Sequence, residues 1–391
     1  MKHKVIVIGA DHHNTLGVVR SLGSKGVNSD VIIVPYKKEI KKVKSKYINS
    51  IKSFPDDGQI ISELLSMESC AKHVLLVTCD IASSLLDTNY NQLKDKFVLF
   101  NSKGRLTDLM SKEAMCHLAM EVGLNVPQYS VWCKGSDMPE DIEFPCITKA
   151  ISSVDGGKSD TTICQSIDEL HDFLKNPDLC PRIQIERFIQ KEIEFQFIGI
   201  SLNGGETIVI PGHSHIDRPN GVQNTYYFQY KENDKTFSTT LELTKKFIRK
   251  SGYSGLFSVE FLRGKDGKDY FLEMNFRNDG NAICVTDAGY NLPYIWYLYA
   301  TGGEYKTEIA NSKFRPVVFC PEFFYFKDYV YGEISFMTWL KGMIKANSYT
   351  DYWKGDNHLY WLKLLYFIMS QMKIKLQVIR GKVEAPKSGI G

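Results

Sequence analysis

The chain has 391 residues, of which 43% are hydrophobic and 24% charged, and its formal net charge is +3. This is the composition of an ordinary globular protein with room for two or three domains, and its near balance of charge excludes the basic footprint of a nucleic-acid-binding protein. Nine cysteines without a Cys-x-x-Cys spacing argue against a disulfide framework and a structural zinc site. No secretory signal is recognised, so the sequence predicts a cytoplasmic protein.

The first hundred residues alternate apolar runs with polar loops, which predicts a parallel α/β domain over residues 1–105. The expected strands are Lys4–Gly9, Val31–Val34, Val74–Thr78 and Phe97–Phe100, with a helix over Leu16–Gly23. The loop after the first strand lacks the Gly-x-Gly-x-x-Gly dinucleotide fingerprint. Loops that follow parallel strands nevertheless hold ligands. We therefore expect a substrate pocket lined by His12, His13, Asn14 and Asp80.

Residues 106–180 form a second predicted unit, built as strand, glycine loop and returning strand. A helical pattern over 106–122 precedes an apolar strand that ends in Lys149, and Gly156 and Gly157 follow in the loop. The loop ends in Gly-Lys-Ser like a phosphate-binding P-loop, but that motif needs a glycine where this chain has Ser152, and the residues from Asp160 onward read as a strand. We therefore discount a P-loop. The shape is instead that of a flexible lid.

Residues 181–312 form a third predicted unit of alternating, antiparallel strands with one helix over 237–251. Its most informative part is the stretch from Glu260 to Glu273, which reads as a hairpin around Asp266-Gly267. A two-residue or four-residue loop centred on that dipeptide places Glu260 directly opposite Glu273, although a bulge at Gly264 would shift the pairing. Phe257, Val259, Phe261, Leu272 and Met274 fall on the other face, which we expect to be the core face.

The two facing carboxylates predict a metal site. Like charges opposite each other on paired strands lie about 5 Å apart at Cβ and destabilise the sheet, so they need a compensating cation. Asn275 lies on the same face as Glu273, and two carboxylates with an amide oxygen suit Mg²⁺, or Mn²⁺. Arg277 continues that face, and a metal with an arginine is a set of groups that handles phosphate.

Residues 313–391 are first aromatic and then helical, without spacing typical of a catalytic site. The most apolar part, residues 359–369, is too short for a membrane span and contains Lys363. We expect it to be a buried helix, with contact to a membrane surface as the less favoured alternative. The sequence leaves a homodimer open.

The order and spacing of these motifs resemble those of the ATP-grasp superfamily, over about residues 1–310. Within it, the chain looks like the carboxylate–amine ligases related to carbamoyl-phosphate synthase, biotin carboxylase and D-alanine–D-alanine ligase. The resemblance implies an N-terminal parallel α/β domain, then two antiparallel-sheet subdomains that clasp ATP, and leaves a helical C-terminal extension outside it.

The resemblance also assigns roles to residues by their position. Lys149, and the less constant Lys112, correspond to lysines that contact the ATP phosphates, and Gly156 and Gly157 to the glycine loop that covers them. Glu260, Glu273 and Asn275 match the metal ligands and Arg277 the phosphate-stabilising arginine, while Arg218 is a candidate for contact with the phosphoryl group or the substrate. The segment that holds adenine and ribose corresponds to Glu186, Arg187, Phe188, Ile189 and Glu194.

One position departs from the family pattern. The ribose-binding acid commonly follows the first acid by seven residues, whereas this chain has Glu192 and Glu194 on either side of that place. We prefer Glu194 and leave Glu192 as the alternative.

The activity implied is ATP- and Mg²⁺-dependent formation of an amide from a small-molecule carboxylate and an amine, through an acyl phosphate, with release of ADP and phosphate. The same ATP site could instead phosphorylate an alcohol, as in a phosphotransferase, or bind nucleotide without turnover. The residue types do not name the acid or the amine.

Overall fold

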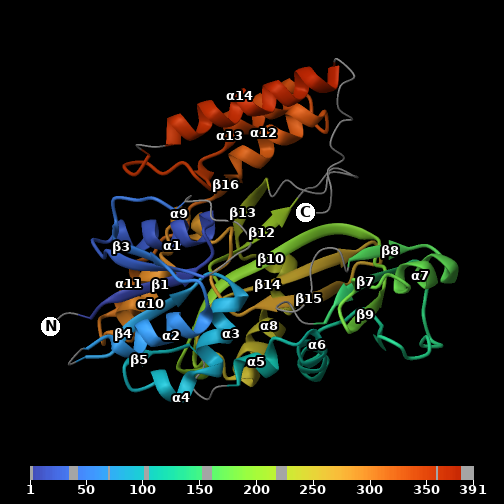
Figure 1. Ribbon diagram of the computed structural model, residues 1–391, viewed down its shortest axis with the longest axis horizontal. Coiled ribbons are helices and arrows are strands. Elements are labelled where there is room, and N and C mark those ends of the chain that lie inside the picture. The colour runs from blue at the N-terminus through green and yellow to red at the C-terminus, as the bar shows by residue number, and fades with distance from the viewer. Residues whose placement is uncertain are drawn as a thin grey trace.

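The computed structural model describes residues 3–34, 43–68, 71–100, 105–151, 161–216, 227–357 and 360–379. These residues form three sheets and a helical layer (Figure 1). The α/β architecture expected from the sequence is confirmed, with one parallel sheet followed by two sheets in which nearly all neighbours are antiparallel.

The N-terminal sheet is parallel, in the order β3-β2-β1-β4-β5. Its strands are β1 (Val5–Gly9), β2 (Ser29–Ile33), β3 (Ile48–Ser53), β4 (His73–Val77) and β5 (Phe97–Val98), and its helices are α1 (His13–Gly23), α2 (Asp57–Ser66), α3 (Asp80–Thr88) and α4 (Tyr90–Leu93). Strand order reverses between β1 and β4, and ligands of such sheets bind at the carboxyl ends of the strands at this switch point. The loops after β1 and β4 meet there.

The second sheet, which we call the lid sheet, has the order β6-β9-β7-β8. It consists of β6 (Tyr129–Cys133), β7 (Cys146–Ala150), β8 (Thr162–Cys164) and β9 (Arg182–Arg187), with α7 (Ile167–Leu174) beside it. Ser166 caps α7, because its side chain accepts a hydrogen bond from the Glu169 amide. The second unit expected from the sequence ends at residue 180, before β9. In the structure β9 pairs with β6 and β7, so the lid sheet extends beyond that boundary.

The helical pattern over residues 106–122 is interrupted. The structure has α5 (Leu106–Leu109) and α6 (Lys112–Glu121), separated at Met110 and Ser111. This break places Lys112 at the start of α6, where its backbone amide donates to the carbonyl of Ile151. The lysine is therefore fixed close to the end of β7.

The third and largest sheet, the central sheet, has the order β15-β14-β10-β12-β13-β16-β17, with β11 added to β10. Its strands are β10 (Lys191–Leu202), β11 (Thr207–Val209), β12 (Gly212–Ile216), β13 (Phe228–Glu232), β14 (Gly255–Gly264), β15 (Asp269–Asn275), β16 (Val317–Cys320) and β17 (Ser348–Tyr349). The associated helices are α8 (Ser238–Ser251), α9 (Ile283–Asp287), α10 (Leu292–Ala300) and α11 (Tyr305–Asn311). Side chains of the N-terminal and central sheets share one apolar core, because α10 packs against β4, β10 and β14.

The C-terminal segment is partly built into this core. β16 and β17 extend the central sheet, and the buried Arg20 of α1 binds Asp356 at 2.9 Å. The helices α12 (Glu322–Tyr331), α13 (Phe336–Lys345) and α14 (Tyr360–Ile379) form a separate layer at the top of Figure 1. None of the helices in the described part of the chain is long and apolar enough to cross a membrane.

The prediction of a buried C-terminal helix is wrong. α14 forms, but Trp361, Leu365 and Met369 are each more than half exposed. An apolar run predicts a helix but not how many of its sides are covered by neighbours. Among the described residues, α12 is the element that packs most extensively on α14.

Candidate active site

The hairpin of β14 and β15 brings the predicted metal ligands together. Glu260 pairs directly with Glu273, and Ser258 pairs with Asn275, as the sequence predicts. We call Glu260, Glu273 and Asn275 the acidic face.

The loop of the hairpin and the pairing next to it differ from those expected. Near the turn Arg263 pairs with Asp269, and the amide of Gly264 donates to the carbonyl of Lys268, so a three-residue loop shifts the pairing by one. A bulge between Phe271 and Glu273 shifts it back. Phe271 is consequently the core residue, and the expectation that Leu272 lies in the core is wrong, since Leu272 is only partly buried.

The two carboxylates of the acidic face differ in their electrostatic surroundings. Burial, and then the charge of Glu273, raise the pKa of Glu260 well above its ordinary value. Burial would also raise the pKa of Glu273, but Lys112 and Lys149 outweigh it and hold that pKa below its ordinary value. Lys112 Nζ lies 3.3 Å from a Glu273 oxygen. Glu260 is therefore the carboxylate whose charge is least compensated by the protein.

Arg277 joins the acidic face to the N-terminal sheet. Its guanidinium donates to both carboxylate oxygens of Asp80, at 2.9 and 3.2 Å, and to Asn275 Oδ1 at 2.9 Å. Burial acts against the charge of Arg277, but Asp80 and Asp279 outweigh it, so the pKa of Arg277 is raised. The arginine stays charged and is held in one orientation.

A second set of contacts locks the same junction. Asn14 Nδ2 donates to the carbonyls of Thr78 and Asn278, and Asn278 Nδ2 donates back to Asn14 Oδ1 at 2.6 Å. The amide of Asn278 also donates to the carbonyl of Val77 at the end of β4. The loop after β15 is thus docked on the switch point of the parallel sheet. Of the predicted pocket residues, Asn14 and Asp80 lie at this junction.

The two predicted pocket histidines begin α1. His12 is its N-cap residue, and its ring lies 3.7 Å from that of His13, between centroids. A side chain at Gly280 would meet His13 Nε2 at 3.3 Å, which places His13 against the loop that follows the acidic face.

On the lid sheet, Lys149 points to Glu186. Lys149 on β7 and Glu186 on β9 form an ion pair of 2.5 Å, and Gln184 Nε2 donates to the second Glu186 oxygen at 2.8 Å. Burial disfavours the lysine charge, yet Glu186 more than offsets it and the pKa of Lys149 is raised. One oxygen of the Glu186 carboxylate is therefore occupied by its ion pair with Lys149.

The rest of the predicted adenine segment lies between the lid sheet and the hairpin. Arg187 donates to the hydroxyl of Tyr270 at 3.1 Å, and the amide of Phe188 donates to the carbonyl of Pro145 at 2.9 Å. Arg187, Phe188 and Ile189 are all partly exposed. An apolar side chain that keeps part of its surface exposed here would suit a base-binding segment, since a ligand would complete its burial.

The structure separates the two candidate ribose acids. Glu192 is exposed and sits at an irregularity where β10 loses its register with β14. Glu194 is partly buried, lies 3.2 Å from Lys191 Nζ, and its charge contributes to raising the pKa of Glu260. The choice of Glu194 as the ribose-binding acid stays a prediction.

Three predicted site residues, Gly156, Gly157 and Arg218, lie outside the described residues. Their roles stay predictions, as does the closing of the glycine loop.

The acidic face fits a divalent cation by the chemistry of its donors. Two carboxylate groups and an amide oxygen converge there, and the charge of Glu273 adds to burial in raising the pKa of Glu260. No cluster of three or more His, Cys, Asp or Glu side chains suited to a metal occurs in the described ranges. A cation on the acidic face would therefore need further oxygen ligands, such as those of phosphates.

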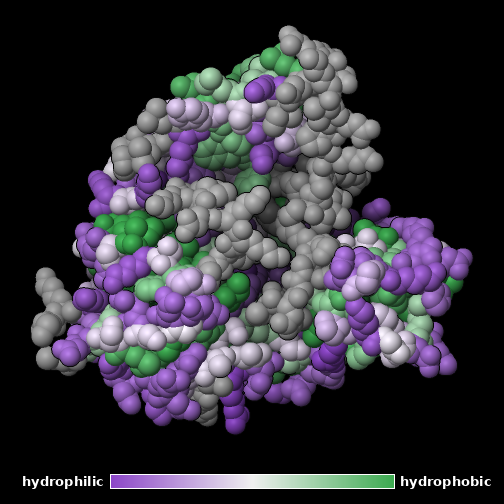
Figure 2. Space-filling view, in the orientation of Figure 1, coloured by the Kyte–Doolittle hydropathy of each residue, from purple (hydrophilic) through white to green (hydrophobic). Residues whose placement is uncertain are grey.

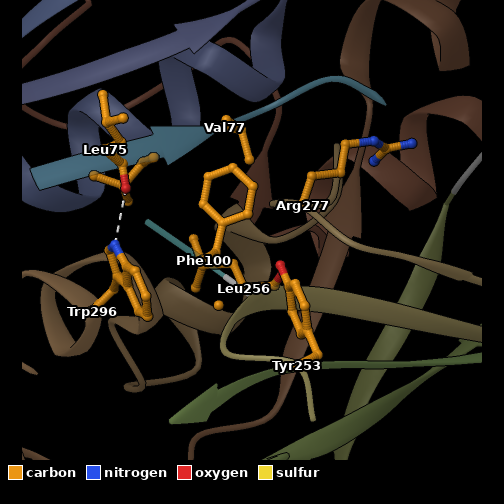
Figure 3. Close-up of a pocket in the computed structure, with 9 residues that line it drawn as sticks. Leu75, Val77, Phe100, Tyr253, Leu256, Arg277 and Trp296 are labelled. Carbon is orange, nitrogen blue, oxygen red and sulfur yellow. Dashed lines mark hydrogen bonds between the residues drawn. The ribbon is translucent and has the colours of Figure 1, made fainter. Parts of the chain in front are cut away.

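A small apolar cavity lies behind Arg277 (Figure 3). Its lining includes Phe100, Leu256 and Trp296, and the Trp296 indole donates to the carbonyl of Leu75 at 2.9 Å. The labelled guanidinium of Arg277 points away from it. Its volume of about 10 Å³ has room for one water at most, so it is a packing defect and no substrate site.

Two contacts of the site were not predicted. The Arg277–Asp80 ion pair joins residues far apart in sequence, and Asp279 accepts hydrogen bonds from Gln196 and Ser258 at 2.9 Å each. The only sequence signal was the position of Asp80 directly after a parallel strand, which indicates the ligand-binding edge but not the partner.

Comparisons with known proteins agree with this geometry. Residues 117–281 match the model of the ATP-grasp domain. The matched range begins within α6 and includes β7, β9 and the whole acidic face. This part of the chain therefore resembles an ATP-grasp domain, as the order of its motifs indicates.

Individual relatives are distant. The chain is 23% identical over 187 residues to the formate-dependent phosphoribosylglycinamide formyltransferase of Flavobacterium psychrophilum, a match that covers 46% of this chain and 48% of that protein. The chain thus spans about half the length of the curated relative it matches.

Solved structures share the fold over a longer stretch. The L-amino acid ligase from Bacillus licheniformis aligns with a TM-score of 0.64 at 14% identity, covering 81% of this chain and 78% of that one. The ADP complex of N5-carboxyaminoimidazole ribonucleotide synthetase aligns with a TM-score of 0.60 at 14% identity, covering 81% of each chain. The biotin carboxylase domain of Hydrogenobacter thermophilus 2-oxoglutarate carboxylase, a dimer in complex with MgADP, aligns with a TM-score of 0.61 at 14% identity, covering 78% of this chain and 70% of that one.

Proposed function

We propose that this protein is an ATP- and Mg²⁺-dependent carboxylate–amine ligase, which activates a carboxylate as an acyl phosphate and transfers the acyl group to an amine. The observation that carries the proposal is the convergence of two lysines from the lid side on the acidic face. Lys112 contacts Glu273 directly, and the charge of Lys149 lowers the pKa of Glu273. Cations facing paired carboxylates form a cleft in which both a phosphate chain and a metal find opposite charge.

Each residue would act by position and charge. Lys149 and Lys112 would bind phosphate oxygens, and Glu194 would hold the ribose. Arg277, oriented by Asp80, would stabilise the charge that develops as the phosphoryl group leaves ADP for the substrate carboxylate. No protein nucleophile is needed, because the carboxylate itself attacks the terminal phosphorus and the amine then displaces phosphate from the acyl carbon.

The cation would be held by Glu260, Glu273 and Asn275, and when bound it would neutralise phosphate charge. The relatives support a nucleotide site of this kind, since two of the aligned structures were determined with ADP or MgADP.

The carboxylate substrate would bind between the acidic face and the switch point of the parallel sheet. Arg277 has an exposed fraction of 18% in its side chain and borders both regions. An arginine so placed can contact a carboxylate and the transferring phosphoryl group together.

The deciding experiment is a screen for ADP release over paired carboxylates and amines, with mass spectrometry of the products. A ligase gives ADP in the presence of both substrates and a product heavier by the amine with loss of water. A phosphorylated product that forms without any amine would identify a phosphotransferase instead. Nucleotide binding without ADP formation for any pair would contradict catalysis.

A further inference from the structure

The C-terminal layer exposes an unusual amount of apolar surface. Among the described residues, ten of the fourteen exposed large hydrophobic side chains lie between Phe324 and Leu376. Figure 2 shows green residues over this layer at the top of the molecule. Single exposed apolar residues are common, whereas a cluster of this kind marks a surface that binds something.

Five of these side chains form one continuous stripe along α14. They follow the spacing i, i+4, i+8, i+11 and i+15, which places them on one side of a helix, and they are between 42% and 61% exposed. We call this set the outer stripe: Trp361, Leu365, Met369, Met372 and Leu376.

The opposite side of α14 holds the helix to the protein. Phe367 packs against Phe323 of α12 with ring centroids 4.8 Å apart, and the hydroxyl of Tyr331 donates to Gln371 Oε1 at 3.4 Å. The outer stripe therefore faces away from α12, and Figure 1 places α14 at the edge of the layer.

The charged side chains of α13 and α14 themselves are all positive, although Lys363 of α14 lies 4.0 Å from Asp351 outside these helices. The sequences of α13 and α14 together contain five lysines and neither aspartate nor glutamate. Lys341, Lys345 and Lys373 are exposed, and α13 adds Met337 and Ile344, which are 56% and 75% exposed. Two aromatic residues with a polar atom, Trp361 and Tyr366, are also exposed on α14.

We propose that α14 is a peripheral membrane anchor, which lies in the plane of an anionic lipid surface with the outer stripe among the acyl chains and the lysines at the headgroups. Helices with one apolar face, flanking lysines and interfacial tryptophan or tyrosine bind membranes in this way without crossing them. A second copy of the chain is the weaker candidate, because a twofold contact through this face would bring the lysines of both copies together. The proposal is independent of the ligase activity.

The test is co-sedimentation of the full chain with vesicles of phosphatidylcholine, with and without phosphatidylserine. We expect binding that needs phosphatidylserine and weakens as salt is added. The variant L365Q/M369Q should bind more than about tenfold more weakly, because two apolar side chains no longer transfer from water to lipid. The variant K341Q/K373Q should bind at least about fivefold more weakly.

Matched controls separate the stripe from general surface effects. M120Q and K175Q make the same chemical changes at exposed positions outside the layer, and they should bind like the unaltered protein. Tryptophan emission should shift to shorter wavelength on binding, and W361F should lose most of that shift. Equal sedimentation of L365Q/M369Q and M120Q would overturn the proposal, as would a solution dimer that L365Q/M369Q dissociates while vesicles bind nothing. Circular dichroism of each variant establishes that the fold is retained.

Discussion

The candidate active site and the C-terminal layer bury their charged groups in opposite ways. In the site each of three carboxylates has a cation in contact, in the pairs Lys149–Glu186, Arg277–Asp80 and Lys112–Glu273. In the layer, the buried Glu322 accepts hydrogen bonds from backbone amides and a hydroxyl, and the buried Asp328 has an oxygen, Oδ2, without a hydrogen-bond partner among the described residues.

This difference in charge pairing indicates that the two regions bind different kinds of partner. Paired charges of opposite sign suit a charged ligand that binds between them. The layer instead directs apolar side chains outward from α13 and α14. Its binding partner would be a surface, whereas the partner of the site would be a small molecule.

The largest effect is expected from Glu273→Gln, which removes a carboxylate proposed to bind the cation on the acidic face. We predict a loss of ATP turnover of about 100-fold or more, since a preorganised electrostatic contact of this kind is worth that much in rate. ADP release measures it, and circular dichroism checks that the fold is intact. Glu232→Gln, at an exposed position on β13, is the control. A fully active Glu273→Gln protein would remove the metal assignment.

A smaller loss is expected from Lys149→Gln on the lid sheet. The phosphates would lose a direct contact, and the buried Glu186 would lose its cation, so we predict that ADP binds about tenfold more weakly by calorimetry. Charge reversal, Lys149→Glu, should weaken binding further. Lys175→Gln removes a lysine from the same subdomain at its exposed surface and should leave affinity unchanged. Unaltered ADP affinity in Lys149→Gln would be incompatible with a phosphate role.

Asp80→Asn tests the junction between the parallel sheet and the hairpin. It breaks the charged hydrogen bonds that orient Arg277, so we predict that the free energy of unfolding falls by about 1–3 kcal/mol. Turnover should fall more than nucleotide affinity does, because Asp80 contacts the arginine. Chemical denaturation and steady-state kinetics measure the two effects. If the free energy of unfolding and the turnover of Asp80→Asn both equalled those of the unaltered protein, Asp80 would have no role in orienting Arg277.

The smallest effect concerns the C-terminal layer and depends on pH. Burial, and then Glu333, raise the pKa of Asp328 to about 7. Because this folded-state pKa lies above the unfolded one, the folded protein is favoured at low pH and loses that advantage as pH rises from about 4 to 7. Asp328→Asn should therefore gain melting temperature relative to the unaltered protein on going from pH 5 to pH 8. A difference in melting temperature that does not change with pH would show that Asp328 does not titrate in this range.

Local patterns were sufficient for much of the fold. The apolar runs of the first hundred residues predicted four of the five parallel strands and missed β3, because this signal depends on neighbouring residues alone. The Glu260–Glu273 pairing was also correct. The prediction assumed a loop of two or four residues, whereas the structure has one of three, which shifts the strand pairing by one residue. The bulge at Leu272 shifts the pairing back by one residue, so Glu260 still faces Glu273.

Other features could not be derived from local patterns. The ion pair of Arg277 with Asp80 depends on how the loop after β15 docks on the parallel sheet. The exposure of α14 depends on how many other elements pack on it. The hydrophobicity of the helix alone does not predict that number.

By itself the sequence determined which residues carry charge, which segments become strands and helices, and which carboxylates face each other in the hairpin. These properties follow from periodicity and turn chemistry over a few neighbouring residues. Only the tertiary structure decided that Lys112 meets Glu273, that Asp80 orients Arg277, and that the outer stripe of α14 is left uncovered. Contacts of this kind join residues distant in sequence, and they are set by the packing of whole elements on one another.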